Sequence, residues 1–170
     1  SVGEDGSIDP PPPEVRVAAV TYVDGMDGDR PLEGYVSLPE KGAAGGSSSA
    51  DALLPAVIIL PHDAHSTVYE TQRATQIADD GGYIAFVAGL GHADDDGEGM
   101  ASDLVLSRIS AAIRHVKDMD GVDPTRIALI GFGLGGTGAL YYAMLDDVDV
   151  DVKAIASFHG DLDLVANATA

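Results

Sequence analysis

Four short apolar runs, separated by segments of helical length, constrain the fold of this chain more than any other feature. Runs of this kind are typical of parallel strands that are buried on both faces of a sheet. They lie at residues 56–60, 83–88, 126–130 and 152–158. Segments that predict helices intervene at residues 68–80, 102–119 and 136–145. Strands that alternate with helices predict βαβ units, and therefore an α/β fold with a doubly wound, mostly parallel sheet.

The first part of the chain predicts an antiparallel addition to this sheet. Residues 15–23 and 32–38 are rich in β-branched and other apolar side chains, and a turn rich in Gly and Asp separates them. Two such runs joined by a short turn predict a β-hairpin. We expect this N-terminal hairpin at one edge of the parallel sheet.

Two segments are expected to lie outside the packed core. Residues 1–14 end in four consecutive prolines, which favour a stiff polyproline II tail. Residues 41–51 contain mostly Gly, Ala and Ser, a composition typical of a flexible loop. The remainder predicts a single domain over residues 15–170. The first residues lack an initiator Met and the pattern of a signal peptide, so we expect a processed, trimmed or fragmentary start.

The charge of the chain excludes several classes of partner. Asp and Glu number 28 against 9 Lys and Arg, which gives a formal net charge of −19. Nucleic-acid binding and docking on anionic lipid both depend on basic side chains, so neither is expected. No apolar run approaches the ~20 residues of a membrane span, so no membrane insertion is expected. The composition leaves localisation open, an organelle or a high-salt environment included. Cysteine is absent, which excludes disulfides and thiolate chemistry.

A glycine-rich turn follows the third apolar run and allows three interpretations. Gly131, Gly133 and Gly136 fit the G-x-G-x-x-G pattern of a dinucleotide-binding turn. The segment 131–135 also has the frame of a nucleophile elbow, G-x-nucleophile-x-G, in which tight packing requires the outer glycines. The third interpretation is a tight turn with no chemical role. In the second interpretation the nucleophile position is Gly133, which has no side chain.

From about residue 20 to residue 163 the chain resembles the dienelactone hydrolase family of α/β-hydrolases. The similar segments are residues 32–36, 60–64, 82–87, 121–137 and 156–160. The most specific is Gly-Val-Asp-Pro-Thr-Arg-Ile-Ala at residues 121–128, which leads into the glycine turn. The resemblance implies a sheet of α/β-hydrolase type that is shortened at its C-terminal end. In that family the triad Asp and His come from later strands and loops than this sequence contains.

The resemblance also implies roles for individual residues. The family hydrolyses small esters or lactones with a Cys-His-Asp triad, in which the elbow thiolate attacks the carbonyl carbon. Gly133 stands at the position of that Cys. The backbone N–H groups of Leu134 and Ala64 stand at the positions of the oxyanion donors. Asp63 stands where the family has a Glu. Two side chains are expected to line the substrate pocket, namely His62 and Phe132.

The remaining histidines and the acidic runs predict no further catalytic or metal site. His115 is expected to pack on its helix and His159 to form hydrogen bonds in a loop. Asp147, Asp149 and Asp151 alternate as in a calcium loop, but Val152 and Phe158 stand where such a loop needs Gly and Glu. We interpret these acids as a solvated approach to the last strand. The acidic cluster at residues 94–96 is expected to lie in a loop over residues 91–99. No metal and no cofactor is expected.

The leading hypothesis is a dienelactone-hydrolase-like protein without catalysis that acts as a binding or structural subunit of a larger assembly. One alternative is a fragment of a hydrolase that acts on small carboxylic esters or lactones. The other is a dinucleotide-binding domain that uses the turn at residues 131–136. A shortened sheet would leave residues 152–158 as an open edge, and we expect a protein partner to cover it.

Overall fold

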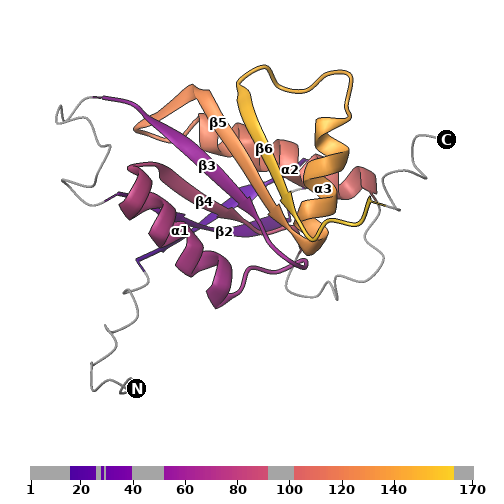
Figure 1. Ribbon diagram of the computed structural model, residues 1–170, viewed down its shortest axis with the longest axis horizontal. Coiled ribbons are helices and arrows are strands. Elements are labelled where there is room, and N and C mark those ends of the chain that lie inside the picture. Colours follow the sequence, from indigo (N-terminus) through magenta and orange to yellow (C-terminus); the bar gives the residue numbers. More distant parts are fainter. Residues whose placement is uncertain (1–15, 26–27, 29, 40–51, 92–101, 163–170) are drawn as a thin grey trace, which may run out of the picture.

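The computed structural model describes residues 16–25, 28, 30–39, 52–91 and 102–162. The predicted tail at residues 1–14, the loop at residues 41–51 and the acidic cluster at residues 94–96 lie outside these ranges. Within them the chain forms strands and helices in alternation (Figure 1). The strands are β1 (Ala18–Val23), β2 (Pro31–Ser37), β3 (Leu54–Leu60), β4 (Ile84–Ala88), β5 (Val122–Phe132) and β6 (Val152–Phe158). The helices are α1 (Val68–Gly81), α2 (Ser102–Lys117) and α3 (Gly133–Ala143).

The six strands form one sheet in the order β1-β2-β4-β3-β5-β6. Strands β4, β3, β5 and β6 run parallel to one another, whereas β1 and β2 are antiparallel to each other and β2 is antiparallel to β4. The prediction of a mostly parallel sheet with an N-terminal antiparallel hairpin is confirmed. Strand β6 pairs only with β5 within the described part of the chain and therefore forms one edge of the sheet.

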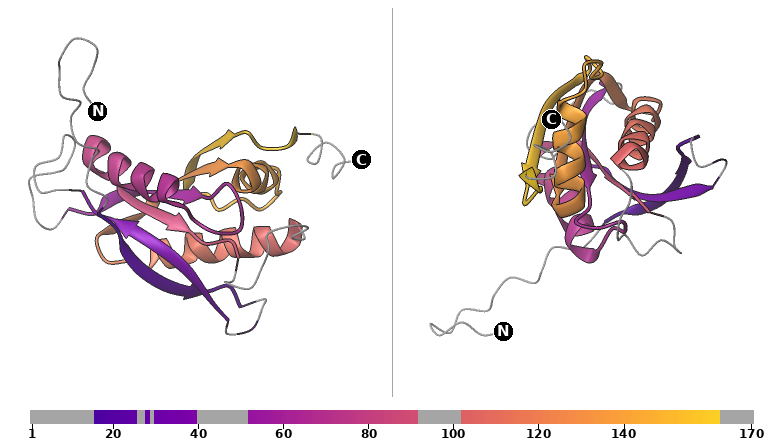
Figure 2. Two further views of the ribbon diagram at one scale, coloured as in Figure 1. Left: turned by 90° about the horizontal axis from the view of Figure 1, so that it is seen from below. Right: turned by 90° about the vertical axis from the view of Figure 1, so that its right-hand side faces the viewer.

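Helices cover both faces of the sheet, as a doubly wound fold requires. Helix α1 packs through its buried alanines against alternate residues of β3 and β4. Helices α2 and α3 pack on the opposite face, where the larger of the two cores lies. Figure 2 shows α1 and α2 on opposite sides of the sheet. The face of α2 that the sequence predicts to be apolar is buried in this core, namely Val105, Ile109, Ile113 and Val116.

Two elements differ from their predicted bounds near the glycine turn. Strand β5 is longer than predicted, because it pairs with β3 from Val122 and continues to Phe132. Helix α3 begins at Gly133 rather than at residue 136. The chain thus passes from strand to helix without a loop. Of the glycines predicted to form a turn, Gly131 belongs to β5, whereas Gly133 and Gly136 belong to the first turn of α3.

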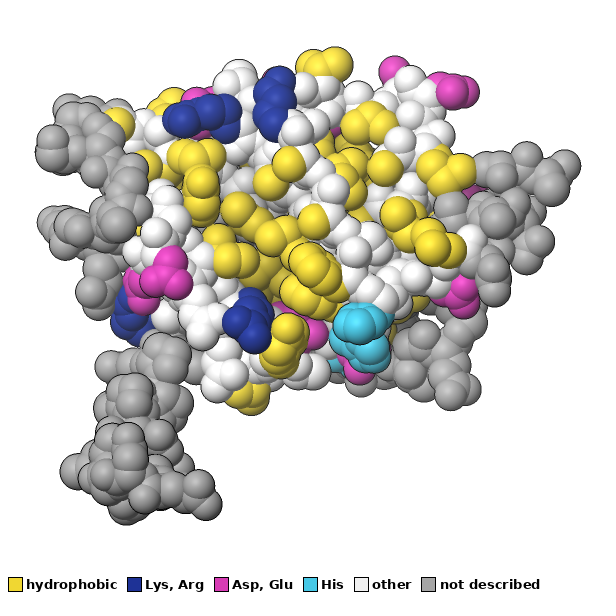
Figure 3. Space-filling view, viewed as in Figure 1, with side chains coloured by type: hydrophobic (Ala, Val, Ile, Leu, Met, Phe, Trp, Pro, Cys, Tyr) yellow, Lys and Arg dark blue, Asp and Glu magenta, His cyan; other side chains and the backbone are white. Residues whose placement is uncertain are grey.

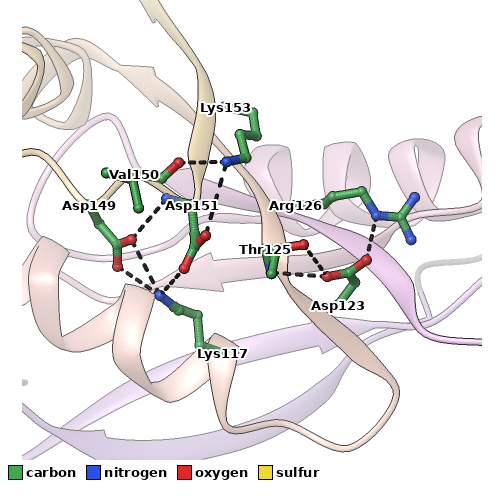
Figure 4. A network of polar contacts seen from close by, with 8 residues as sticks. All are labelled: Lys117, Asp123, Thr125, Arg126, Asp149, Val150, Asp151 and Lys153. Atoms are coloured by element: carbon green, nitrogen blue, oxygen red, sulfur yellow. Dashed lines mark hydrogen bonds and ion pairs between the residues drawn. The ribbon is translucent and has the colours of Figure 1, made fainter.

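Ion pairs fix the approach to β6 (Figure 4). The ammonium group of Lys117 lies 3.0 Å from a carboxylate oxygen of Asp149 and 2.7 Å from one of Asp151. Hydrogen bonds to Asp151 and then Asp149 raise the pKa of Lys117, against a smaller opposing effect of burial. Asp149 and Asp151 are therefore not merely solvated, because they attach the start of β6 to the end of α2.

His115 gives folding a pH dependence that we expect to be measurable. Its ring lies 5.4 Å from the ring of Tyr22, on which it stacks, and 5.4 Å from that of Phe86. Burial lowers the pKa of His115 below its ordinary value of 6.5, although the nearby Asp118 carboxylate opposes this. The unfolded chain then binds the proton more tightly than the folded one, so stability is complete above pH 6.5 and falls as the pH decreases through that value.

Unfolding by urea at a series of pH values would measure this effect. The variant His115→Phe keeps an aromatic ring and removes the titration, so its stability should fall less than that of the native chain between pH 7 and pH 5. The variant His65→Gln, at an exposed position, is the matched control for removal of a histidine. An equal loss of stability in the Phe variant and the native chain would contradict the prediction.

Candidate functional site

The turn between β5 and α3 has the backbone of a nucleophile elbow. Gly133 lies in the left-handed region with φ +48°, which fits a strained strand-to-helix turn. A Cβ atom on Gly131 would lie 2.2 Å from the carbonyl oxygen of Gly135, and one on Gly135 would lie 2.6 Å from backbone atoms of Leu60. The flanking glycines are therefore required by the close approach of neighbouring backbone segments, as the elbow frame predicts.

The space beside Gly133, where a nucleophile would project, is occupied by His62. A Cβ atom on Gly133 would lie 2.4 Å from Nδ1 of His62 and 2.6 Å from its backbone carbonyl oxygen. The imidazole belongs to an exposed residue and can turn away. The carbonyl oxygen is fixed, because it accepts a hydrogen bond of 2.8 Å from the N–H of Leu134. The segment that follows β3 is thus packed directly onto the elbow.

The same packing engages the amide groups at the start of α3. Besides the bond from Leu134 to His62, the N–H of Gly135 donates to the carbonyl oxygen of Pro61 at 3.0 Å. The N–H of Leu134, a predicted oxyanion donor, could bind an oxyanion only if the His62 carbonyl moved. These two amides are equally unavailable to a pyrophosphate, which a dinucleotide-binding turn would hold at this helix end. The other predicted donor belongs to Ala64, a buried residue whose carbonyl accepts from Leu90 and Gly91.

A cavity of about 420 Å³ opens beside the elbow. It brings together three predicted residues, His62, Asp63 and Phe132, with side chains from the start of α1 and from the segment that follows β6. Its lining consists of His62, Asp63, Thr67, Tyr69, Glu70, Phe132 and His159. Asp63 uses one carboxylate oxygen to accept from the backbone N–H of His65 at 2.9 Å. The cavity is therefore polar at the loop that follows β3 and aromatic toward the sheet.

Three residues of the cavity lining were not predicted from the sequence, namely Thr67, Tyr69 and Glu70. Glu70 is the most buried of them. Its side chain is buried, with 1% exposed, and its carboxylate accepts hydrogen bonds from the backbone N–H groups of His62 at 3.2 Å and Thr67 at 2.8 Å. Burial raises the pKa of the Glu70 carboxyl, but hydrogen bonds from Thr67, Glu70 itself and His62 outweigh it and hold the pKa below its ordinary value. The signal in the sequence was the capping box Thr67-x-x-Glu70, which begins α1.

His159, which the sequence predicts to lie in a loop, also lines the cavity. It follows β6 directly and adopts φ +58°, an uncommon backbone conformation for a residue with a side chain. The neighbouring Phe158 stacks on Phe132 with a ring separation of 5.3 Å. His159, directly after β6, thus completes one wall of the cavity.

Residue 133, at the centre of the elbow frame, is a glycine and has no side chain. The hydroxyl of Thr67 caps α1 and contacts the Glu70 carboxylate, so it is engaged in structure. Within the described part of the chain, no three His, Asp or Glu side chains converge as a metal site would need. In the same ranges, no helix has both the length and the apolar character needed to cross a membrane.

Comparison with known proteins identifies the family. The sequence model of the Dienelactone hydrolase family matches residues 42–169. No curated protein is similar enough in sequence to count as a match.

Solved structures share the fold at low sequence identity. A dienelactone hydrolase-like promiscuous phosphotriesterase from metagenomic libraries is 23% identical, with a TM-score of 0.59, over 85% of this chain and 59% of that one. A putative dienelactone hydrolase from Klebsiella pneumoniae is 18% identical, with a TM-score of 0.62, over 86% of this chain and 61% of that one. An esterase from Pyrobaculum calidifontis is 22% identical, with a TM-score of 0.61, over 84% of this chain and 44% of that one. The chain therefore spans about half to three fifths of these structures. The family match and the elbow geometry lead to one conclusion: the chain belongs to the dienelactone hydrolase family and has the α/β-hydrolase fold.

Proposed function

We propose that this chain is a dienelactone-hydrolase-like domain without covalent hydrolase catalysis, and that it acts as a binding or structural subunit. One observation carries the proposal. Gly133 has no side chain to attack a carbonyl carbon, and the His62 carbonyl oxygen lies where its Cβ would project. The engagement of the Leu134 N–H supports the same conclusion, because oxyanion stabilisation by preorganised donors is a major part of catalysis in such sites.

Hydrolysis of p-nitrophenyl acetate provides the test. The chain should release p-nitrophenol no faster than a heat-denatured control. The proposal would be overturned by turnover above that control, provided that this turnover disappeared in the cavity variants His62→Ala and His159→Ala. Comparison with these variants separates reaction in the cavity from reaction at scattered surface groups.

A hydrolase fragment is the second candidate, and the length of the relatives favours it. The chain spans 59% and 61% of two dienelactone hydrolase-like structures, so a longer polypeptide with a later Asp and His would complete more of the triad. Even such a polypeptide would lack a nucleophile at residue 133. Ester hydrolysis by the longer polypeptide, lost on substitution of a later His, would establish this candidate.

We propose further that a protein partner covers the edge of the sheet at β6. This strand has no second neighbour within the described residues, and Ala154 and Phe158 are exposed on it. An open apolar edge strand readily pairs with another chain. In the isolated chain, the β6 amides that point away from β5 should exchange hydrogen rapidly. Protection of every β6 amide would mean that copies of the chain already cover the edge and that no other partner is needed.

A further inference from the structure

Helix α2 buries a basic side chain that does not line the cavity. Basic side chains normally lie at the surface, as Figure 3 shows for several Lys and Arg residues, because water solvates their charge there. Arg108 is instead 1% exposed, although the chain has only 9 basic residues. A charge is buried this deeply only where other groups compensate it, so the contacts of Arg108 indicate what it does.

Arg108 joins the N-terminal hairpin to the segment that follows β4. Its Nε atom lies 3.7 Å from a carboxylate oxygen of Asp24, directly after β1, and the side chain of Asp24 is 3% exposed. Its Nη1 atom donates a hydrogen bond to the carbonyl oxygen of Leu90, two residues beyond the end of β4. The hydroxyl of Tyr22 donates to the neighbouring carbonyl oxygen of Gly89 at 2.7 Å. The start of this segment is therefore held by side chains of both the hairpin and α2.

The segment that follows β4 in turn holds the loop that follows β3. The N–H groups of Leu90 and Gly91 both donate to the carbonyl oxygen of Ala64, at 3.0 and 2.7 Å. A Cβ atom on Gly91 would lie 2.5 Å from that of Ala64, so the two segments are in close contact. Two residues before Ala64, the carbonyl oxygen of His62 accepts from the N–H of Leu134 at the elbow. A continuous series of contacts thus runs from α2 to the elbow.

We infer that Arg108 is a positioning residue that holds the loop at residues 61–64 against the elbow. Its effect passes through Leu90 and then through Ala64, because energetic coupling between distant positions is carried by packed and hydrogen-bonded segments of this kind. The wall that this loop contributes to the cavity is then fixed by a side chain from the opposite face of the sheet. The inference goes beyond the proposed function, because it holds whether or not the cavity hydrolyses esters.

Hydrogen exchange of single amides, followed by NMR, tests the inference on the 170-residue chain. The double variant Asp24→Asn/Arg108→Met removes both charges, so neither is left buried without its partner. Central amides of β3 are the reference, because core amides exchange only when the whole domain unfolds. Relative to them, the amides of Gly91 and Leu134 should exchange about tenfold faster than in the native chain, the size expected for loss of one hydrogen bond to a charged group. A general loss of stability would not raise this exchange ratio.

Ile109 provides a matched control, because it is fully buried on the same helix and lies toward α3. The variant Ile109→Ala should destabilise the same core without raising the exchange ratio. Acceleration of all amides by one factor in the double variant would overturn the inference and limit Arg108 to a general contribution to stability. Acceleration at Gly91 but not at Leu134 would also overturn it, and would leave Glu70 as the anchor of the loop.

The milder variant Arg108→Lys covers the case in which the double variant does not fold. It keeps a positive charge beside Asp24 but replaces the planar guanidinium and its five N–H donors with a single ammonium group. The exchange ratio at Gly91 and Leu134 should rise by about threefold, as for a hydrogen bond that is weakened rather than lost. If the double variant does not fold, a ratio in Arg108→Lys equal to that of the native chain would overturn the inference.

Discussion

Replacing Gly133 with Ala is expected to lower the free energy of unfolding by about 2–5 kcal/mol. A side chain in the left-handed region costs about 1–2 kcal/mol, and forcing an extra carbon into a packed site adds about 1–3 kcal/mol. Both costs apply here, because φ is +48° and the added Cβ would lie 2.6 Å from the fixed carbonyl oxygen of His62. Urea denaturation of the two proteins would measure the difference.

Gly25 is a matched control for the conformational part of this cost. It has φ +79°, and a Cβ there would meet nothing within 4 Å. The variant Gly25→Ala should therefore lose only about 1–2 kcal/mol. Addition of His62→Ala to the Gly133 variant should recover less than half of its loss, because the imidazole goes but the carbonyl remains. A Gly133 variant no less stable than the Gly25 variant would show that the position beside the elbow is open.

Replacing Glu70 with Ala is expected to lower the free energy of unfolding by about 2–4 kcal/mol. The substitution leaves the partly buried backbone N–H groups of His62 and Thr67 without their acceptor, and an unsatisfied donor costs up to about 1–3 kcal/mol. It also breaks the capping box at the start of α1. The loop that follows β3 should loosen as a result, because its hydrogen bond to α1 disappears.

The pH dependence of this loss identifies its electrostatic part. The pKa of Glu70 in the folded chain lies below its ordinary value of 4.5, so its charge stabilises the fold above pH 4.5 and this contribution disappears as the pH falls through the lower value. The difference in the free energy of unfolding between the native chain and Glu70→Ala should therefore be constant near neutral pH and become smaller in acid. Glu33, exposed on β2, is the control, and Glu33→Ala should change stability by less than about 0.5 kcal/mol. If the difference in the free energy of unfolding stayed the same in acid, Glu70 would stabilise the fold through packing alone.

The regular elements were predictable because local patterns determine them. The predicted bounds of β6 agree with the structure, because the change from acidic to apolar residues in the sequence marks where the strand begins. Helix α1 begins at the predicted Val68 and ends beside Gly82, which adopts the left-handed C-cap conformation. The position of the elbow followed from the spacing of its glycines.

The contacts that decide what the site can do were not predictable, because they join segments far apart in the chain. The obstruction at Gly133 comes from a loop some seventy residues earlier, and its position depends on the hydrogen bond between Leu134 and His62. The apolar face of α2 was predicted, but the burial of Arg108 on that helix was not. Arg108 is 1% exposed and lies 3.7 Å from the carboxylate of Asp24 in the hairpin, a partner that no local pattern indicates.

The His62 carbonyl has a consequence for how this domain could change over generations. Any side chain at residue 133 meets a backbone atom, and no substitution at residue 62 removes a backbone atom. A mutation that restored a thiol or hydroxyl there would lower stability before it could offer any chemistry, unless the loop from Pro61 to Ala64 had already shifted. A nucleophile could therefore be gained only after the loop had changed. Because selection acts on one codon at a time, the loss of stability would oppose a substitution at residue 133 alone. A protein engineer would meet the same loss of stability and would need to replace the loop and the elbow together.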